Sequence, residues 1–141
     1  MARVWYNCQL LFSFTGFTFF GNLILMSVIS YPPSRFSPSE AHQIAKTLYG
    51  FEVSVKVLDS ERDQNFYLKR EDGKEFVLKI SNPAEDIELI KLQVASLKHI
   101  ANFDSSIQVP STIQTEGGEF ISQHNGCFIR LQSFLAGHFI K

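Results

Sequence analysis

The chain has little of several residue types that would assign it to a simple class of protein. It has two cysteines, Cys8 and Cys127, which are too few for the disulfide framework of a small secreted scaffold, and neither stands at a metal-ligand spacing. It has no run of Lys or Arg, and its formal net charge of −1 gives no electrostatic case for binding nucleic acid. A Walker-type glycine–lysine pattern is also absent, which argues against a P-loop nucleotide site.

Charge is missing from the start of the chain. No charged residue occurs between Val4 and Ser34, and residues 10–29 are rich in Phe, Leu and Ile. A helix needs roughly 20 mostly apolar residues to cross a bilayer, although Ser, Thr, Asn and Gly interrupt this run. We therefore separate a hydrophobic N-terminal extension, residues 1–35, from a folded part, residues 36–141. The extension has three interpretations: a membrane segment at 10–29, a signal peptide, or a non-native upstream extension of a protein that begins near Met26. We favour the last.

The folded part has the composition of one domain, since 45% of the 141 residues are hydrophobic and 13% aromatic. Ser37 and Glu40 form a capping-box pattern that begins a short helix, and Gly50 is suited to end it after Tyr49. Alternating apolar residues then predict strands at 52–58, 65–70 and 76–81, and Asp72-Gly73 predicts the hairpin turn between the last two.

A long helix is predicted next. Pro83 and the acidic residues Glu85, Asp86 and Glu88 mark its start, and it should end near Asn102. Its apolar stripe is interpreted as core packing: Ile87, Ile90, Val94, Leu97 and Ala101. Strands at 107–114, interrupted by a proline, and at 127–135 complete the prediction. The expected fold is α+β, with an antiparallel sheet of about five strands, a short N-terminal helix and one long helix inserted after the third strand.

One lysine stands inside the apolar strand at 76–81. Because side chains alternate along a strand, Lys79 should face away from Phe76, Leu78 and Ile80. A buried lysine needs an anionic partner. The order of strand, polar loop, strand, lysine strand and acidic helix start is the layout of a kinase N-terminal lobe. In such a lobe the loop covers the nucleotide phosphates, the lysine contacts them and a helix carboxylate holds the lysine.

The sequence resembles the aminoglycoside phosphotransferase-like small-molecule kinases. The nearest branches are the hydroxylysine kinases and the phosphotransferase domains fused to class III aminotransferases. The resemblance covers 36–141 and implies a protein-kinase-like N-terminal lobe that is truncated at the hinge. It rests on residues 60–66, 76–82, Gln93, 109–110, 129–131 and 135–137.

The resemblance implies roles for individual residues. Lys79 matches the lysine that contacts the α and β phosphates, the loop at 60–65 matches the turn that covers them, and 134–137 matches the hinge whose backbone bonds the purine. Glu61 and Asp63 would repel phosphates if they pointed inward, and Arg130 has no assigned role. The predicted nucleotide-binding residues are Lys79, Ser60, Arg62, Asn65, Phe134 and Leu135. The residue that orients the lysine is predicted to be Gln93 or Glu88.

The implied cofactor is ATP or GTP with Mg, whose ligands we expect on the C-terminal lobe. The chain has no His-x-Asp loop, so we expect no catalytic or metal-binding residue in it and no turnover by it alone. The predicted function is the nucleotide-binding lobe of a cytoplasmic kinase that phosphorylates a hydroxyl of an amino acid or amino sugar. The alternative is a non-enzymatic lobe that binds a partner protein or is tethered to a membrane through residues 10–29.

Overall fold

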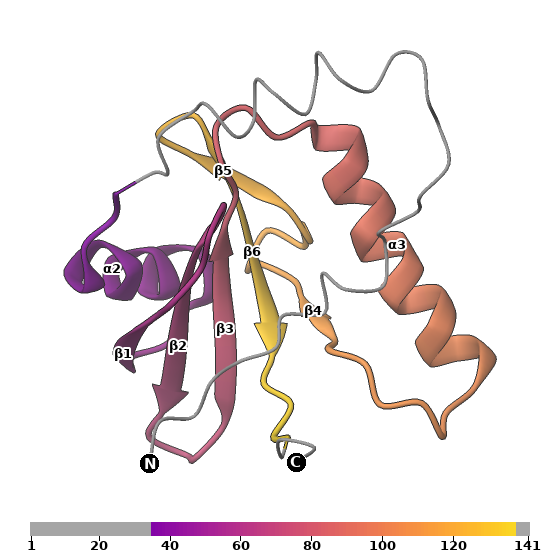
Figure 1. The fold of residues 1–141 in the computed structure, drawn as a ribbon. Helices are drawn as coiled ribbons and strands as arrows, with labels where there is room; N and C mark the ends of the chain where they lie inside the picture. The colour runs from indigo at the N-terminus through magenta and orange to yellow at the C-terminus, as the bar shows by residue number, and fades with distance from the viewer. Residues whose placement is uncertain (1–34, 138–141) are drawn as a thin grey trace.

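The computed structural model describes residues 35–137, in which a curved antiparallel sheet is flanked by two helices (Figure 1). The sheet has six strands in the order β1-β2-β3-β6-β4, and β5 pairs with β6. The elements are α2 (Pro38–Tyr49), β1 (Val53–Leu58), β2 (Gln64–Arg70), β3 (Glu75–Ile80), α3 (Ile87–Phe103), β4 (Thr112–Ile113), β5 (Ser122–His124) and β6 (Cys127–Ser133). The α+β architecture and the long helix after the third strand are as predicted.

Helix α2 has the termini that its sequence predicts. The Ser37 hydroxyl accepts from the Glu40 amide at 3.2 Å, and the Glu40 carboxylate accepts from the Ser37 amide at 2.7 Å, which completes the capping box. Gly50 ends the helix with φ 73°, and a Cβ at this position would run into the carboxylate of Glu116. The Glu116 amide donates to the Leu48 carbonyl at 2.9 Å. The turn after β4 therefore packs against the C-terminus of α2.

The hydrophobic core lies between α2 and one face of the sheet. Phe76, Leu78 and Ile80 point into it, as alternation along β3 predicts, so that Lys79 belongs to the opposite face. The buried members are Phe36, Ala41, Ile44, Ala45, Tyr49, Val53, Phe66, Leu68, Phe76, Leu78, Ile80, Cys127, Ile129 and Leu131. The core thus fixes strands β2, β3 and β6, which carry the polar residues of the other face.

Helix α3 begins later than predicted. Its N-cap is Asp86, whose carboxylate accepts from the Glu88 amide at 2.9 Å. Before it, Asn82 forms a turn: its side chain accepts from the Ala84 amide at 3.0 Å and its carbonyl from the Glu85 amide at 2.9 Å. An Asn side chain that bonds the backbone two residues ahead competes with helix formation. Glu85 therefore precedes the helix instead of lying in its first turn.

The α3 stripe is only partly buried: Ile87, Val94 and Leu97 are half-buried, and no stripe residue belongs to the core cluster. Ile90 is its one fully buried residue, and Ala101 is exposed. The helix stands beside the edge of the sheet near β4, whereas α2 covers the core face (Figure 1). Leu89, Leu92 and Phe103 are left 45%, 55% and 82% exposed.

The C-terminal strands also differ from the prediction. The strand expected at 107–114 is reduced to β4, and a hairpin that was not predicted joins β5 to β6. Its turn is Asn125-Gly126, with φ values of 50° and 78°. Both angles are positive, as a tight two-residue hairpin turn requires. The sheet consequently has six strands where about five were expected.

Neither α2 nor α3 is long and apolar enough to cross a membrane, and these are the helices of residues 35–137. The predicted extension at 1–35, with its possible membrane segment at 10–29, lies almost wholly outside the described residues. The three interpretations of it stay predictions.

Candidate functional site

A row of polar side chains crosses the face of the sheet opposite α2. Lys79 on β3 stands directly opposite Asn65 on β2 and Arg130 on β6. Residues paired in this way point to the same face, with Cβ atoms about 4.5–5.5 Å apart. Their exposed fractions are 5%, 4% and 3%. The structure therefore brings together two of the predicted site residues, Lys79 and Asn65, and adds Arg130 to them.

The β1–β2 loop is fastened beside this row by its own side chains. Arg62 Nη2 lies 3.2 Å from Glu85 Oε2, which joins the loop to the turn before α3. Asn65 Nδ2 donates to Ser60 Oγ at 3.1 Å. Asp63 is 5% exposed and accepts from the Asn82 amide at 3.4 Å. Asp63 thus points inward, which the sequence argument treated as unfavourable, and it contributes to holding the loop.

The ionisable groups at this end of the sheet influence one another. Burial raises the pKa of Glu85, and the neighbouring Asp63 carboxylate raises it further, while Arg62 and Arg130 act in the opposite direction. Burial lowers the pKa of Arg130, and Asp63 and Glu85 counteract that effect. Among the described residues, this cluster and Lys79 combine three basic side chains with three acidic ones, Asp63, Glu85 and Asp86. Basic and acidic side chains are thus equal in number at this end of the sheet.

Several polar atoms of the site are buried without a hydrogen-bond partner. Seven side-chain atoms of residues 35–137 are in this state, and five of them belong to Arg62, Asn65, Ser81 and Arg130. A buried polar group without a partner lowers the stability of the fold by roughly 1–3 kcal/mol, and native proteins contain few such groups. Their concentration around Lys79 is the pattern that a site for a polar ligand produces.

The structure does not bring Glu88 to the sheet. Its carboxylate pairs with Lys91 Nζ at 2.7 Å on the helix surface, and its side chain is 71% exposed. Gln93 lies half-buried in α3, and its role stays a prediction. Besides Asp63, the carboxylate that lies in the cluster is Glu85, which was not among the predicted site residues because the sequence predicts a helix start there.

The segment after β6 lies at the far end of the same face. Phe134 donates its amide to the Glu75 carbonyl at 3.0 Å, and its ring packs edge-on against Tyr67, with 5.2 Å between centroids. Leu135 follows with 36% exposure. Phe134 is four residues beyond Arg130, which is about 13 Å along a strand.

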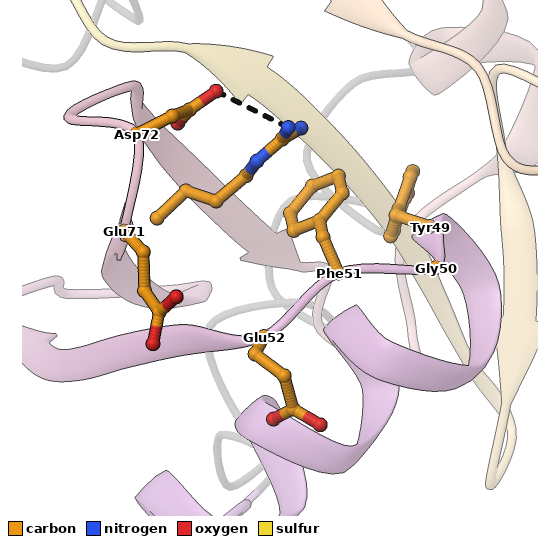
Figure 2. A pocket seen from close by; sticks show the side chains of 7 residues that line it. Tyr49, Gly50, Phe51, Glu52, Glu71 and Asp72 are labelled. Atoms are coloured by element: carbon orange, nitrogen blue, oxygen red, sulfur yellow. Dashed lines mark ion pairs between the residues drawn. The ribbon is translucent and has the colours of Figure 1, made fainter.

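A pocket of the described residues lies away from this face. It is an open hollow of about 500 Å³ at the other end of β2, and its lining includes Phe51 and Asp72 (Figure 2). Arg70 lies over the Phe51 ring, 5.4 Å from its centroid, and pairs with Asp72 at 3.1 Å. The β1–β2 loop is at the opposite end of β2. None of the predicted site residues therefore lines this hollow.

Residues 35–137 contain no group of three His, Cys, Asp or Glu side chains placed to hold a metal ion. The Mg ligands are expected on a C-terminal lobe, and the metal requirement stays a prediction.

Comparison with known proteins agrees with the fold and with the predicted family. The chain is 42% identical to the hydroxylysine kinase of Danio rerio over 69 residues, which are 47% of this chain and 19% of that protein. Its fold is similar to that of amicoumacin kinase, solved with AMP-PNP, Ca2+ and Ami, with a TM-score of 0.63, 15% identity and coverage of 74% of this chain and 33% of that one.

A second similar structure is spectinomycin phosphotransferase, APH(9)-Ia, solved with ADP and spectinomycin, with a TM-score of 0.57 and 17% identity over 72% of this chain and 30% of that one. The chain spans a third or less of the length of each of these proteins. The family model described as "Phosphotransferase enzyme family" matches residues 54–139, more than half of the chain. This protein belongs to the phosphotransferase enzyme family.

Proposed function

We propose that residues 35–137 form the nucleotide-binding lobe of a small-molecule kinase and that the polar row around Lys79 binds the phosphates. The observation that carries the proposal is the burial of Lys79 between Asn65 and Arg130 on the face opposite the core. A strand lysine in this position matches the kinase residue that contacts the α and β phosphates. The family match and the two nucleotide-containing structural neighbours support the same conclusion.

The nucleotide would lie along the sheet from the polar row to the segment after β6. Val77, paired with Tyr67 and Gln132, separates the two ends and offers an apolar surface to the sugar and base. The amide of Phe134 is engaged with Glu75, so the hydrogen bonds to the purine would fall to the backbone of Leu135 and the residues after it. Phe134 would then contribute its ring instead of its amide.

The β1–β2 loop would cover the phosphates without a glycine-rich turn. The Arg62–Glu85 ion pair and the Asp63–Asn82 bond fix the loop from both sides. The Arg62 side chain is 40% exposed and can turn its guanidinium toward a phosphate. Ser60 and Asn65 can present a hydroxyl and an amide from the same position. The loop residues predicted to bind phosphate therefore keep that role in the proposal.

The complete reaction would transfer the γ-phosphoryl group of ATP or GTP, with Mg, to a hydroxyl of an amino acid or amino sugar. The similarity to a hydroxylysine kinase favours an amino acid acceptor. Phosphoryl transfer needs a base-like aspartate and metal ligands, which in this fold come from the C-terminal lobe. We therefore propose that the 141-residue chain has no turnover by itself, and that it is cytoplasmic unless residues 10–29 attach it to a membrane.

A second candidate function is binding of a partner protein. The exposed apolar side chains of α3, Leu89, Leu92 and Phe103, favour it. Exposed apolar patches of this kind mark interfaces or aggregation-prone surfaces. Light scattering over a range of protein concentrations tests whether the partner is a second copy of this chain: a monodisperse monomer at all concentrations contradicts self-association through α3.

Titration calorimetry with ATP and GTP tests the nucleotide site. The variant is Lys79→Ala, and the matched control is Lys74→Ala, whose side chain is 67% exposed in the β2–β3 turn. The expected result is that Lys79→Ala weakens binding at least tenfold, because a charge-assisted contact is removed, while the control binds like the wild type. Equal affinities for all three proteins, or no binding by the wild type, would contradict the proposal.

A further inference from the structure

We propose that Arg130 is a second phosphate-binding residue, and that its guanidinium and the Lys79 ammonium together bind the polyphosphate of the nucleotide. This inference rests on the proposed function, because it assigns a further ligand to the same site. Neither the layout of the sequence nor the roles implied by the family resemblance gave Arg130 a function.

The first support is the position of Arg130 in the sheet. It is paired with Lys79 across the β3–β6 ladder, so the two side chains leave the sheet next to each other on the same face. Arg130 is 3% exposed. An anionic ligand between the two side chains could accept hydrogen bonds from both.

The second support is the hydrogen-bonding state of the guanidinium. Arg130 Nε and Nη1 are both buried and have no hydrogen-bond partner. Nη1 is cis to Cδ, so the two unsatisfied groups point to different sides of the planar guanidinium, and each can donate to a separate oxygen of a polyphosphate. A buried arginine with two unsatisfied donors is expected where a polyanionic ligand binds.

The nearby carboxylates do not complete the arrangement. Asp63 and Glu85 influence Arg130 electrostatically, but Glu85 is bonded to Arg62 at 3.2 Å and Asp63 accepts from the Asn82 amide. Arg62 and Glu85 thus hold the loop in this structure, and the unsatisfied Nε–H and Nη1–H groups of Arg130 are available to a ligand. Of the two arginines, only Arg130 lies in the row with Lys79.

The test measures binding of ADP and of inorganic tripolyphosphate by the full chain. The variant is Arg130→Gln, and the matched control is Arg70→Gln, which removes an arginine paired with Asp72 at the far end of β2. Loss of two charge-assisted hydrogen bonds should weaken both ligands by about tenfold to a hundredfold. Tripolyphosphate has no base, so an equal loss for both ligands places the effect at the phosphates. The control should bind both ligands like the wild type.

The outcomes separate this inference from the proposed function. If the wild type binds ADP, Lys79→Ala loses it and Arg130→Gln keeps it, the inference is overturned and the nucleotide site stands. If the wild type binds neither ligand, both are overturned. A variant that only lowers the melting temperature, with unchanged affinities below it, shows a structural role for Arg130 and also overturns the inference.

A measurement on the wild type covers the case in which Arg130→Gln does not fold. The Nε–H resonance of Arg130, assigned by its loss in Arg130→Lys, is followed by NMR during a tripolyphosphate titration. Formation of an Nε–H···O bond should shift this signal, while the Nε–H signal of Arg70 stays in place. An unchanged Arg130 signal in a protein that binds tripolyphosphate overturns the inference.

Discussion

The Arg62–Glu85 ion pair should connect the β1–β2 loop to the start of α3 energetically, and a double-mutant cycle can measure that connection. Its N···O distance is 3.2 Å. With an effective dielectric constant of about 20, Coulomb's law gives about 5 kcal/mol of direct attraction at such a distance. The Arg62 side chain is 40% exposed and that of Glu85 10%, so water screens the pair and the net coupling should be about 1–2 kcal/mol.

The single variants should differ in a defined order. Arg62→Gln leaves Glu85 buried and unpaired, whereas Glu85→Gln leaves the half-exposed Arg62, which water can solvate. Burial already raises the pKa of Glu85 above its ordinary value of 4.5. Arg62→Gln should therefore be the more destabilising change at neutral pH. Its effect should shrink as the pH falls and Glu85 becomes protonated.

The sign of the pH dependence follows from the bound protons. An acid whose pKa is raised on folding binds more protons in the folded than in the unfolded state at pH values between the two pKa values. Stability therefore falls as the pH rises through that window, which begins near the ordinary value of 4.5 for Glu85. Glu85→Gln should remove this part of the pH dependence.

Urea unfolding of the wild type, the two single variants and the double variant gives the coupling free energy. The matched control is the Glu88–Lys91 pair, whose side chains are 71% and 57% exposed and whose coupling should stay below about 0.5 kcal/mol. A coupling for Arg62–Glu85 no larger than that of the control would refute the idea that this pair fastens the loop.

Two further predictions concern the support behind the site. Gly50→Ala should lower the free energy of unfolding by about 1–2 kcal/mol or more, because φ is positive and the added Cβ meets Glu116. The control Gly73→Ala, at φ 85° with nothing within 4 Å of the added Cβ, should show the backbone cost alone. Equal losses of stability in urea unfolding would contradict the contact with Glu116. Leu78→Ala, at a fully buried core position, should lower the free energy of unfolding by about 3–5 kcal/mol. Leu92→Ala, at a side chain that is 55% exposed, should change it by less than about 1 kcal/mol. Comparable losses for the two variants would contradict the exposure of Leu92.

The parts of the fold that the sequence predicts are those decided by neighbouring residues. Ser37 and Glu40 cap α2 through contacts three residues apart, and Gly73 supplies the positive φ of the β2–β3 turn. Alternation along β3 is equally local, and it places Lys79 on the face opposite the core. The turn at Asn125-Gly126 is a local signal of the same kind, and it could have predicted β5.

The parts that sequence reasoning missed depend on contacts between distant segments. Arg130 is 51 positions after Lys79, and only the β3–β6 register places the two side by side. Glu85 was assigned to a helix because Pro83 and acidic residues are typical of helix starts, but the Asn82 turn and the contact with Arg62 hold it outside. The apolar stripe of α3 predicts a helix, but it cannot show that α2 occupies the core face of the sheet.

The measurement that tests the central claim most directly is an ATP titration of the 15N-labelled full chain, followed by backbone amide shifts. The account predicts that shifts gather at Asn65, Lys79, Arg130 and Leu135, along the face opposite the core. Shifts confined to the hollow beside Phe51, or no shifts at all, would contradict it.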